Sequence, residues 1–264
     1  MTLTPIDRVR LRKAAVDEGF GIDRGEADDW LAFDSIDAPA AVRLTRDPTG
    51  YIAATNHNGV ATDLATHWQP WPGAAPVGFT AFVATNTTEL HMLVREMWRL
   101  ARSLPIEPLR AFEAETRNLP RTTEAERLVV QRVGQNIFRD ALMEYWGSSC
   151  AVLGVTEPRL LRASHIRPWA ECDTDAERLD VYNGLLLAAH LDAAFDAFLI
   201  SFDDSGQIII SDALTAPDRT ALGLSSDLRL SKVVPSHLPK LAWHRGRLAT
   251  SGNHPSDAQW GASK

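Results

Sequence analysis

A histidine, an asparagine and two aspartates stand in this chain at spacings that could support metal-assisted chemistry. His165 ends an apolar run, LLRASH, and Asn183 opens a second apolar run, NGLLLAA, eighteen residues later. The polar residues that follow are His190, Asp192 and Asp196. Two aspartates four residues apart lie on the same face of a helix, about one turn from each other. The pair could therefore chelate one metal ion.

Hydrolysis of a phosphodiester needs a base to deprotonate water and positive charge to offset the phosphate. A neutral histidine can act as the base near pH 7. A hard divalent cation, which prefers oxygen ligands, can supply the charge. The sequence therefore favours metal-assisted cleavage of a nucleic acid. His190 is two residues from Asp192, so the two share a face only if His190 still has strand or cap geometry.

The segments around these residues resemble the HNH endonucleases of the ββα-metal (His-Me finger) superfamily, in the subgroup without zinc-binding cysteines. The resemblance covers about residues 127–250. It rests on four segments, RVGQNIFRDALMEYWGSSCAVLGV, LLRASHIRPW, YNGLLLAAHLDAAFDAFLISFDDSGQIIIS and LAWHRGRL. It implies a C-terminal ββα-metal nuclease domain that cuts DNA, most simply double-stranded DNA.

The resemblance also implies roles for individual residues. His165 matches the general base, and Asn183 matches the asparagine that braces the loop behind it. Asp192 and Asp196 match the two metal-ligand positions on the family's helix. The family usually has histidine where Asp192 stands, and often has a ligand where this chain has Ser164. These departures imply an oxygen-rich site for one Mg²⁺ or Mn²⁺ rather than zinc, and leave open whether the aspartate or the histidine two residues before it is the main ligand.

Contacts to the nucleic acid are expected near the base. Arg162 and Arg167 flank it and could hold phosphates. Gln135 and Arg139 occupy matching family positions on the preceding helix, where packing is the other interpretation. His244 resembles a family position near the C-terminus and is interpreted as structural.

Composition narrows the function classes. The chain has 264 residues, 45% of them apolar, so it can bury a large core. Its two cysteines, Cys150 and Cys172, cannot form a four-cysteine zinc site or a disulfide framework, and Cys150 is expected to be a buried apolar residue. The net charge of −7 argues against a nonspecific basic nucleic-acid binder. The N-terminus has no signal-peptide core and no run is long enough for a membrane helix, so we expect a soluble cytoplasmic protein.

The chain is expected to be an α+β protein with two parts. Residues 1–118 are predicted to form a small N-terminal α/β domain of unknown role, with DNA reading as one hypothesis. Trp68 and Trp71 could stack on a base there, or could pack on their own domain. Residues 119–250 are predicted to form the HNH domain, with a disordered tail over 251–264. A homodimer is compatible with a double-strand cut, but no dimer surface is readable.

Hydrophobic periodicity and cap residues predict the main elements. Helices are expected over residues 4–18, from Thr88 to about 104, from Thr123 to Gly147 and over 190–197. Strands are expected over 41–47, 51–57, 77–85, 159–166 and 184–189, with a hairpin turn at 203–206.

Two other functions compete with the nuclease. The first is a catalytically weak HNH-like module that binds DNA, which the Ser164 and Asp192 departures favour. The second is a 2-oxoacid-dependent iron oxygenase with two histidines and one carboxylate. Its iron site would combine His190 and Asp192 with a distal histidine, either His237 or His244. Arg245 or Arg247 would then hold the 2-oxoacid. That fold needs many strands on both sides of the motif, and the flanking segments are too helical for it.

Overall fold

The computed structural model describes residues 3–120 and 122–250, and it divides into two compact units at Pro108. The expected α+β class is confirmed, with helices and strands in both units. The division comes earlier in the chain than the expected boundary near residue 118. The tail expected over 251–264 lies outside the described residues.

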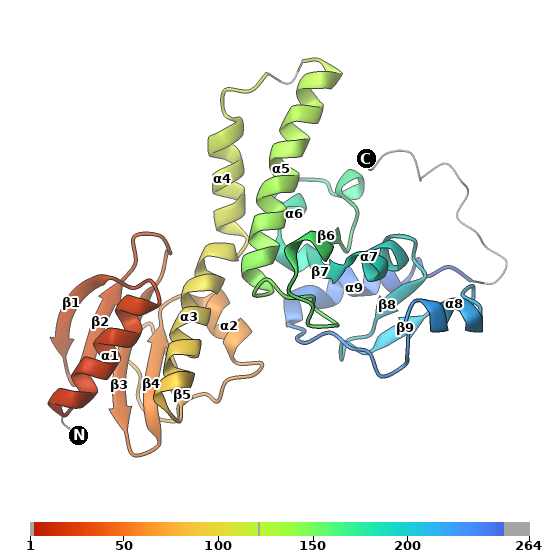
Figure 1. Ribbon diagram of the computed structural model, residues 1–264. Coiled ribbons are helices and arrows are strands. Elements are labelled where there is room, and N and C mark those ends of the chain that lie inside the picture. The colour runs from red at the N-terminus through yellow and green to blue at the C-terminus, as the bar shows by residue number, and fades with distance from the viewer. Residues whose placement is uncertain (1–2, 121, 251–264) are drawn as a thin grey trace. The chain divides into compact units, whose positions relative to one another are not determined.

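The first unit is a five-stranded antiparallel sheet with three helices (Figure 1). The strands follow one another in the order β1-β2-β3-β4-β5. The elements are α1 (Pro5–Asp17), β1 (Ile22–Ala27), β2 (Trp30–Asp34), β3 (Ala41–Asp47), β4 (Gly50–Thr55), α2 (Asn58–Leu64), β5 (Thr80–Ala84) and α3 (Thr87–Ser103).

Local sequence signals account for the helix starts in this unit. Thr4 caps α1 in a reciprocal capping box with Asp7, and Pro5 occupies the first turn. Asn86 caps α3 by accepting the backbone N–H of Glu89. The apolar face predicted for this helix is buried. Both predictions of helices in this unit are therefore confirmed.

The hairpin of β1 and β2 is an addition to the predicted elements. Its turn places Asp28 and Asp29 at φ of 52° and 64°, the left-handed conformation that a tight hairpin turn requires. Strand β1 is mostly exposed and polar, so it lacks the alternation of apolar and polar residues that reveals a strand.

The sheet of the first unit is covered on both faces. Helices α1 and α3 pack against each other and on the strands, over an almost fully buried layer that includes Leu44 and Phe82. On the opposite face Trp71 packs on a second apolar cluster and donates its indole N–H to Asp47 at 2.8 Å. The indole of Trp68 donates to Glu96 at 2.9 Å. Both tryptophans therefore pack on their own unit, which is the second of the two interpretations above.

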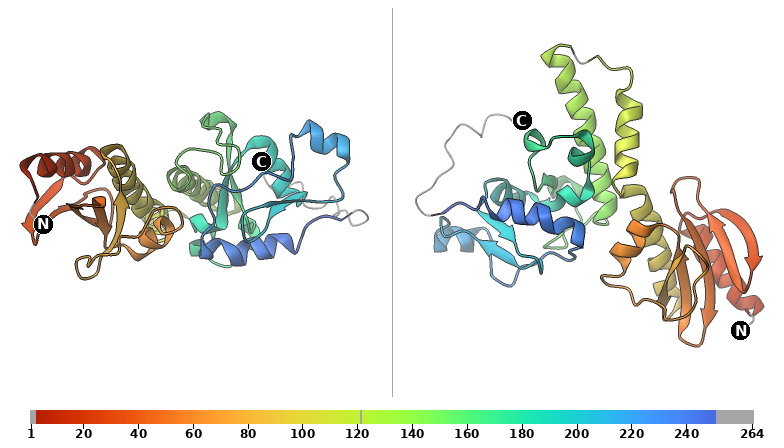
Figure 2. Two further views of the ribbon diagram at one scale, coloured as in Figure 1. Left: turned by 90° about the horizontal axis from the view of Figure 1, so that it is seen from below. Right: turned by 180° about the vertical axis from the view of Figure 1, so that it is seen from behind.

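The second unit contains the strand–strand–helix segment. Its elements are α4 (Ile106–Thr116, whose first residues precede the division), α5 (Glu124–Tyr145), β6 (Leu161–His165), α6 (Asp175–Arg178), β7 (Gly184–Ala188), α7 (Ala189–Asp196), β8 (Ile200–Phe202), β9 (Ile208–Ile210), α8 (Ala216–Ala221) and α9 (Leu238–Arg245). Short 3-10 turns lie at Pro158–Leu160, Trp169–Glu171, Val181–Asn183 and Pro235–His237. Helices α4 and α5 run side by side in opposite directions (Figures 1 and 2).

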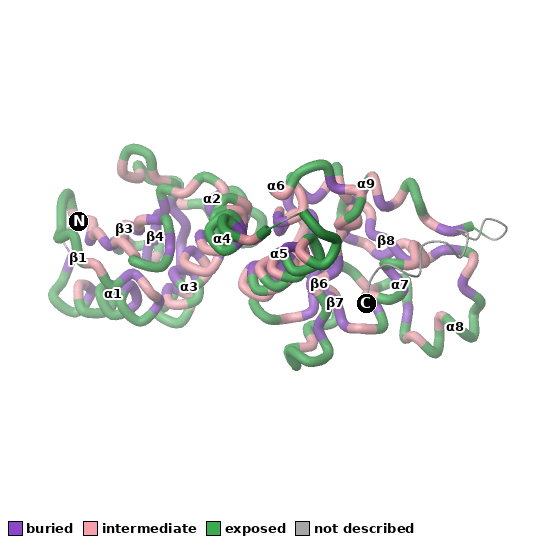
Figure 3. The backbone as a smooth tube through the Cα atoms, turned by 90° about the horizontal axis from the view of Figure 1, so that it is seen from above, coloured by how far each residue is buried: buried purple, intermediate pink, exposed green. Residues whose placement is uncertain are grey.

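Strands β6 and β7 pair antiparallel, with His165 opposite Gly184. Strand β7 is buried along its whole length (Figure 3). Strand β6 is buried at Leu161 and Ser164. Helices α5 and α7 both contact β6. Side chains alternate between the faces of a strand; His165 faces α5, whereas Ser164 faces α7. The ββα arrangement expected from the sequence is therefore present.

Two buried histidines, His237 and His244, make hydrogen bonds in the C-terminal part of this unit. His244 donates from Nε2 to the carbonyl of Phe195 at 3.1 Å and stacks on the Phe195 ring, with centroids 3.7 Å apart. Its Nδ1 lies 3.0 Å from the hydroxyl of Ser201. The Nδ1 of His237 accepts the backbone N–H of Val234 at 3.1 Å. Both side chains are buried, and the structural role expected for His244 agrees with these contacts.

Close packing of α5 on β7 depends on a glycine. A Cβ atom at Gly184 would lie 2.5 Å from Cζ of Phe138 and 2.8 Å from a methyl group of Leu142.

No described helix is long and apolar enough to cross a membrane.

Replacing Gly184 with alanine should destabilise the second unit by about 1–3 kcal/mol, since the added methyl group overpacks the contact with Phe138. Chemical denaturation followed through second-unit NMR signals would measure the loss. The matched control is Gly246→Ala, where the nearest atom to the new Cβ is 3.5 Å away. Equal effects of the two substitutions would contradict the packing argument.

Acid should destabilise the second unit through its buried histidines. Burial lowers the pKa of His237 to about 3 and that of His244 to about 4. The unfolded chain, with ordinary histidine pKa values near 6.5, binds more protons below that pH, so stability falls as pH drops from about 6.5 towards 4.

At pH 5 each of these two histidines should lower the free energy of unfolding by about 2 kcal/mol relative to its value at neutral pH. In His237→Asn the difference in unfolding free energy between pH 7 and pH 5 should shrink by about that amount. An unchanged pH difference in this variant would show that His237 does not contribute to it.

Candidate active site

His165 lies at the end of β6 in a fixed orientation. Its Nε2 is 2.9 Å from the carbonyl oxygen of Arg178. A carbonyl can only accept, so Nε2 carries the proton and Nδ1 keeps its lone pair. The ring stacks on Phe138, with centroids 3.8 Å apart, and meets Trp169 edge-on at 5.7 Å.

The surroundings of His165 keep it uncharged. Burial lowers its pKa to about 4, against the opposing effect of the Arg178 carbonyl. The imidazole is therefore neutral at pH 7, with one nitrogen available to accept a proton. This is the protonation state that a general base needs.

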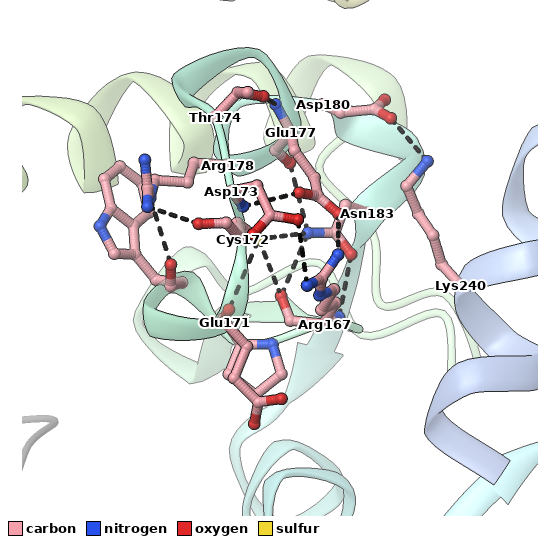
Figure 4. A network of polar contacts seen from close by, with 12 residues as sticks. Arg167, Glu171, Cys172, Asp173, Thr174, Glu177, Arg178, Asp180, Asn183 and Lys240 are labelled. Carbon is pink, nitrogen blue, oxygen red and sulfur yellow. Dashed lines mark hydrogen bonds and ion pairs between the residues drawn. The ribbon is translucent and has the colours of Figure 1, made fainter. Parts of the chain in front are cut away.

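Asn183 connects the two ends of the loop behind His165. Its Oδ1 accepts the backbone N–H of Arg167 at 2.9 Å, and its Nδ2 donates to the Arg167 carbonyl at 3.1 Å. The same Nδ2 lies 3.3 Å from the carbonyl of Glu177 and 3.4 Å from Sγ of Cys172. The side chain is fully buried, and Figure 4 shows it at the centre of the polar network. Because Arg167 is two residues after His165, the amide ties the loop to the end of β6.

Ion pairs add to the loop network. Arg167 pairs with Glu177 at 2.7 Å and with Asp173 at 3.4 Å. Lys240 pairs with Asp180 at 2.7 Å (Figure 4). The two carboxylates offset the charge of Arg167, and these ion pairs hold its guanidinium against the loop. The phosphate contact expected of Arg167 stays a prediction beside these ion pairs.

Asp192 and Asp196 lie on α7 next to β6. The hydroxyl of Ser164 donates to Oδ1 of Asp196 at 3.2 Å and also interacts with the Asp192 carboxylate. Asp196 keeps a solvent-exposed edge, yet desolvation of its carboxylate and the charge of Asp192 raise its pKa to about 6. Desolvation likewise raises the pKa of Asp192. Two repelling carboxylates with raised pKa values fit a hard divalent cation, which would offset the repulsion.

His190 does not join these carboxylates. It is exposed at the start of α7, two residues from Asp192, and such residues do not face each other on a helix. Within residues 3–120 and 122–250, no three or more His, Cys, Asp or Glu side chains are grouped to hold a metal. His237 and His244 make buried hydrogen bonds with the backbone of Val234 and Phe195 instead. The structure therefore brings together neither the three-ligand set with His190 nor the iron site.

The other predicted contact residues differ in their availability. Arg162 is exposed on β6, where it donates to the carbonyls of Arg159 and Leu161 and its charge acts on Asp192. Arg139 donates to the carbonyls of Leu161 and Pro158, both at 2.9 Å. That pair of bonds ties α5 to the start of β6, so the packing interpretation fits Arg139. Gln135 is half-buried on α5, one turn before Arg139.

Three residues around His165 are absent from the sequence expectations for the site. Phe138 forms its stacking wall, and Arg178 supplies the acceptor for its ring proton. Gly134 makes room for Trp169, since a Cβ atom there would lie 2.4 Å from the indole ring. A glycine inside an otherwise regular helix is the one sequence signal for this close approach.

Comparison with known families agrees with this geometry. A family model described as HNH endonuclease matches residues 150–203, a span within the 127–250 resemblance that includes β6, β7 and α7. The comparison with curated proteins finds no match. The match to this family indicates nuclease activity on nucleic acid and, in general, the use of a divalent metal. Residues 150–203 of this chain are therefore an HNH endonuclease domain.

Proposed function

We propose that this protein is a metal-dependent endonuclease that hydrolyses DNA phosphodiester bonds, with His165 as the general base. The observation that carries the proposal is the hydrogen bond from Nε2 of His165 to the Arg178 carbonyl. It leaves Nδ1 as a proton acceptor on an imidazole that is neutral at working pH. A water molecule held against Nδ1 would lose its proton as it attacks the phosphorus.

Asn183 supports the base without touching the reacting atoms. Its amide holds both backbone groups of Arg167 and the carbonyl of Glu177. Glu177 immediately precedes Arg178, whose carbonyl orients His165. A fully buried amide that satisfies several backbone groups is costly to lose, because its partners would remain buried and unpaired. We assign Asn183 this bracing role.

Asp192 and Asp196 would hold the metal ion. Two carboxylates are a sufficient protein contribution for Mg²⁺ or Mn²⁺, which retain waters and also bind substrate phosphate. When bound, the ion would stabilise charge on the phosphate and on the leaving oxygen. Zinc usually takes three or four protein ligands, and the described residues offer no such cluster. The donor set therefore favours Mg²⁺ or Mn²⁺ over zinc, and no structural zinc is expected.

Arg162 is the candidate phosphate contact with the best support. It is exposed on the strand that leads to His165, and it lies close enough to Asp192 for their charges to interact. Gln135 remains a candidate on α5. Arg139 donates to a backbone carbonyl and Arg167 pairs with a carboxylate, contacts that support a structural role for both more than a direct phosphate contact.

The proposal also covers the biological role, the substrate and the oligomeric state. A DNA endonuclease in the cytoplasm would suit restriction or phage defence, with double-stranded DNA as the substrate and a homodimer as one route to a double-strand cut. The N-terminal region would then select the DNA, including modified DNA. These assignments rest on the family's chemistry and on the presence of a separate unit.

A catalytically weak DNA-binding module is the second candidate. The hydroxyl of Ser164 stands where the family often has a metal ligand, and no group of three potential ligands is found among the described residues. Such a module would bind DNA with little cleavage. The experiments below separate the two candidates.

Plasmid cleavage should require His165. With Mg²⁺ or Mn²⁺ the wild type should cut plasmid DNA, and His165→Ala should lower the rate by about 100-fold or more, the usual contribution of a general base. EDTA should abolish cutting by the wild type. Unmodified and modified plasmids, tested side by side, would assign or refute a reader role for the first unit.

His67→Ala is the matched histidine control, because this histidine lies in the first unit, outside the HNH domain. It should cut at the wild-type rate. DNA binding without metal-dependent cutting by the wild type would favour the binding module. Equal cutting by His165→Ala would remove His165 from the mechanism.

Removing one carboxylate should weaken metal binding directly. In Asp196→Asn we expect Mn²⁺ affinity, measured by calorimetry or electron paramagnetic resonance, to fall about tenfold or more, since a neutral amide offers one weak ligand oxygen. Asp227→Asn, an exposed aspartate elsewhere in the second unit, should bind Mn²⁺ as the wild type does. Unchanged affinity in Asp196→Asn would place the metal elsewhere.

A further inference from the structure

The guanidinium of Arg178 contacts three other residues of the loop between β6 and β7. Its Nε donates to the carbonyl of Trp169 at 3.2 Å, its Nη1 pairs with Asp175 at 3.0 Å, and its Nη2 donates to the carbonyl of Cys172. The side chain is about one-fifth exposed. Figure 4 shows it spanning the loop. One planar fork thus satisfies two backbone carbonyls and one carboxylate.

The same residue also contacts His165 through its backbone. The carbonyl of Arg178 accepts the Nε2 proton of His165 at 2.9 Å. The guanidinium carbon lies 5.8 Å from the centre of the Trp169 ring, and that ring meets His165 edge-on. Arg178 therefore fixes the acceptor of the ring proton and supports one aromatic wall of the imidazole.

Arg167, in the same loop, offers an instructive contrast. Its backbone is held by the side chain of Asn183, so those bonds remain when the Arg167 side chain is shortened. The backbone around the Arg178 carbonyl has fewer such supports: Asn183 reaches only the carbonyl of the preceding Glu177, at 3.3 Å, and the N–H of Arg178 donates to Thr174 at 3.1 Å. Arg178 is the last residue of α6, a helix of four residues, too short to be stable without tertiary contacts. The contacts of its own guanidinium with Trp169, Cys172 and Asp175 add to these backbone bonds in fixing the position of its carbonyl.

We infer that Arg178 is a positioning residue for His165: its guanidinium, bonded to Trp169, Cys172 and Asp175, holds its own carbonyl where it accepts the imidazole ring proton. The inference rests on the proposed function of His165 as a base. Loss of the guanidinium frees the carbonyl, and the imidazole then loses its fixed orientation while the fold and the substrate contacts remain. Supporting residues of this kind typically change activity by about 10–100-fold.

The test compares Arg178→Ala with a matched arginine. In Arg219 the Nε and Nη2 donate to the carbonyls of Leu214 and Ser211, both at 2.9 Å, so Arg219→Ala removes similar bonds elsewhere in the second unit. Two readouts are needed on the full chain. The first is the exchange rate with water of the His165 Nε2 proton, measured by NMR without metal or DNA. The second is kcat and KM for cleavage of duplex DNA with Mg²⁺.

We expect the ring proton to exchange at least about tenfold faster in Arg178→Ala than in the wild type, with kcat lowered about 10–100-fold and KM nearly unchanged. Arg219→Ala should match the wild type in both readouts. If Arg178→Ala does not fold, Arg178→Lys decides in its place, because lysine keeps the charge but cannot fork to two carbonyls. It should show the same changes to a smaller degree.

Ring-proton exchange at the wild-type rate in a folded Arg178 variant would overturn the inference, and so would wild-type kcat despite faster exchange. If the wild type cuts no DNA, the proposed function fails, and the exchange rate alone then decides whether Arg178 orients His165.

Discussion

The buried side-chain amide of Asn183 is the interaction on which the site depends. It donates to and accepts from the backbone of Arg167, at 3.1 and 2.9 Å, and so closes the loop between the two strands. Without it these backbone groups would be buried and unpaired, a cost of about 1–3 kcal/mol for each group. The loop then returns the carbonyl of Arg178 to His165. A single amide thereby links the second strand to the base at the end of the first.

Strand geometry separates the base from the carboxylates. Ser164 and His165 are consecutive, so their side chains leave β6 on opposite faces. His165 packs on Phe138 of α5, and Ser164 reaches Asp196 of α7. His165 is thus half-buried against aromatic rings, where desolvation keeps it neutral, while Asp196 is exposed to solvent.

The sequence was sufficient for the elements whose residues signal them locally. The caps at Thr4, Asn86 and Thr123 begin helices as expected, and the two short strands flank the loop as predicted. It was insufficient where contacts join distant residues. Nothing local shows that Arg167 pairs with Glu177, or that a backbone carbonyl orients the base. Helix periodicity did predict the pairing of the two α7 aspartates, and it also explains why the nearby histidine stays apart.

The most direct test of the account is the protonation of His165 itself. Nitrogen NMR of the imidazole in the metal-free protein, followed from pH 7 to pH 4, resolves both ring nitrogens. The account predicts a proton on Nε2, none on Nδ1 at pH 7, and titration of Nδ1 only near pH 4. A proton on Nδ1 at pH 7 would contradict it, because His165 could not then accept a proton from water.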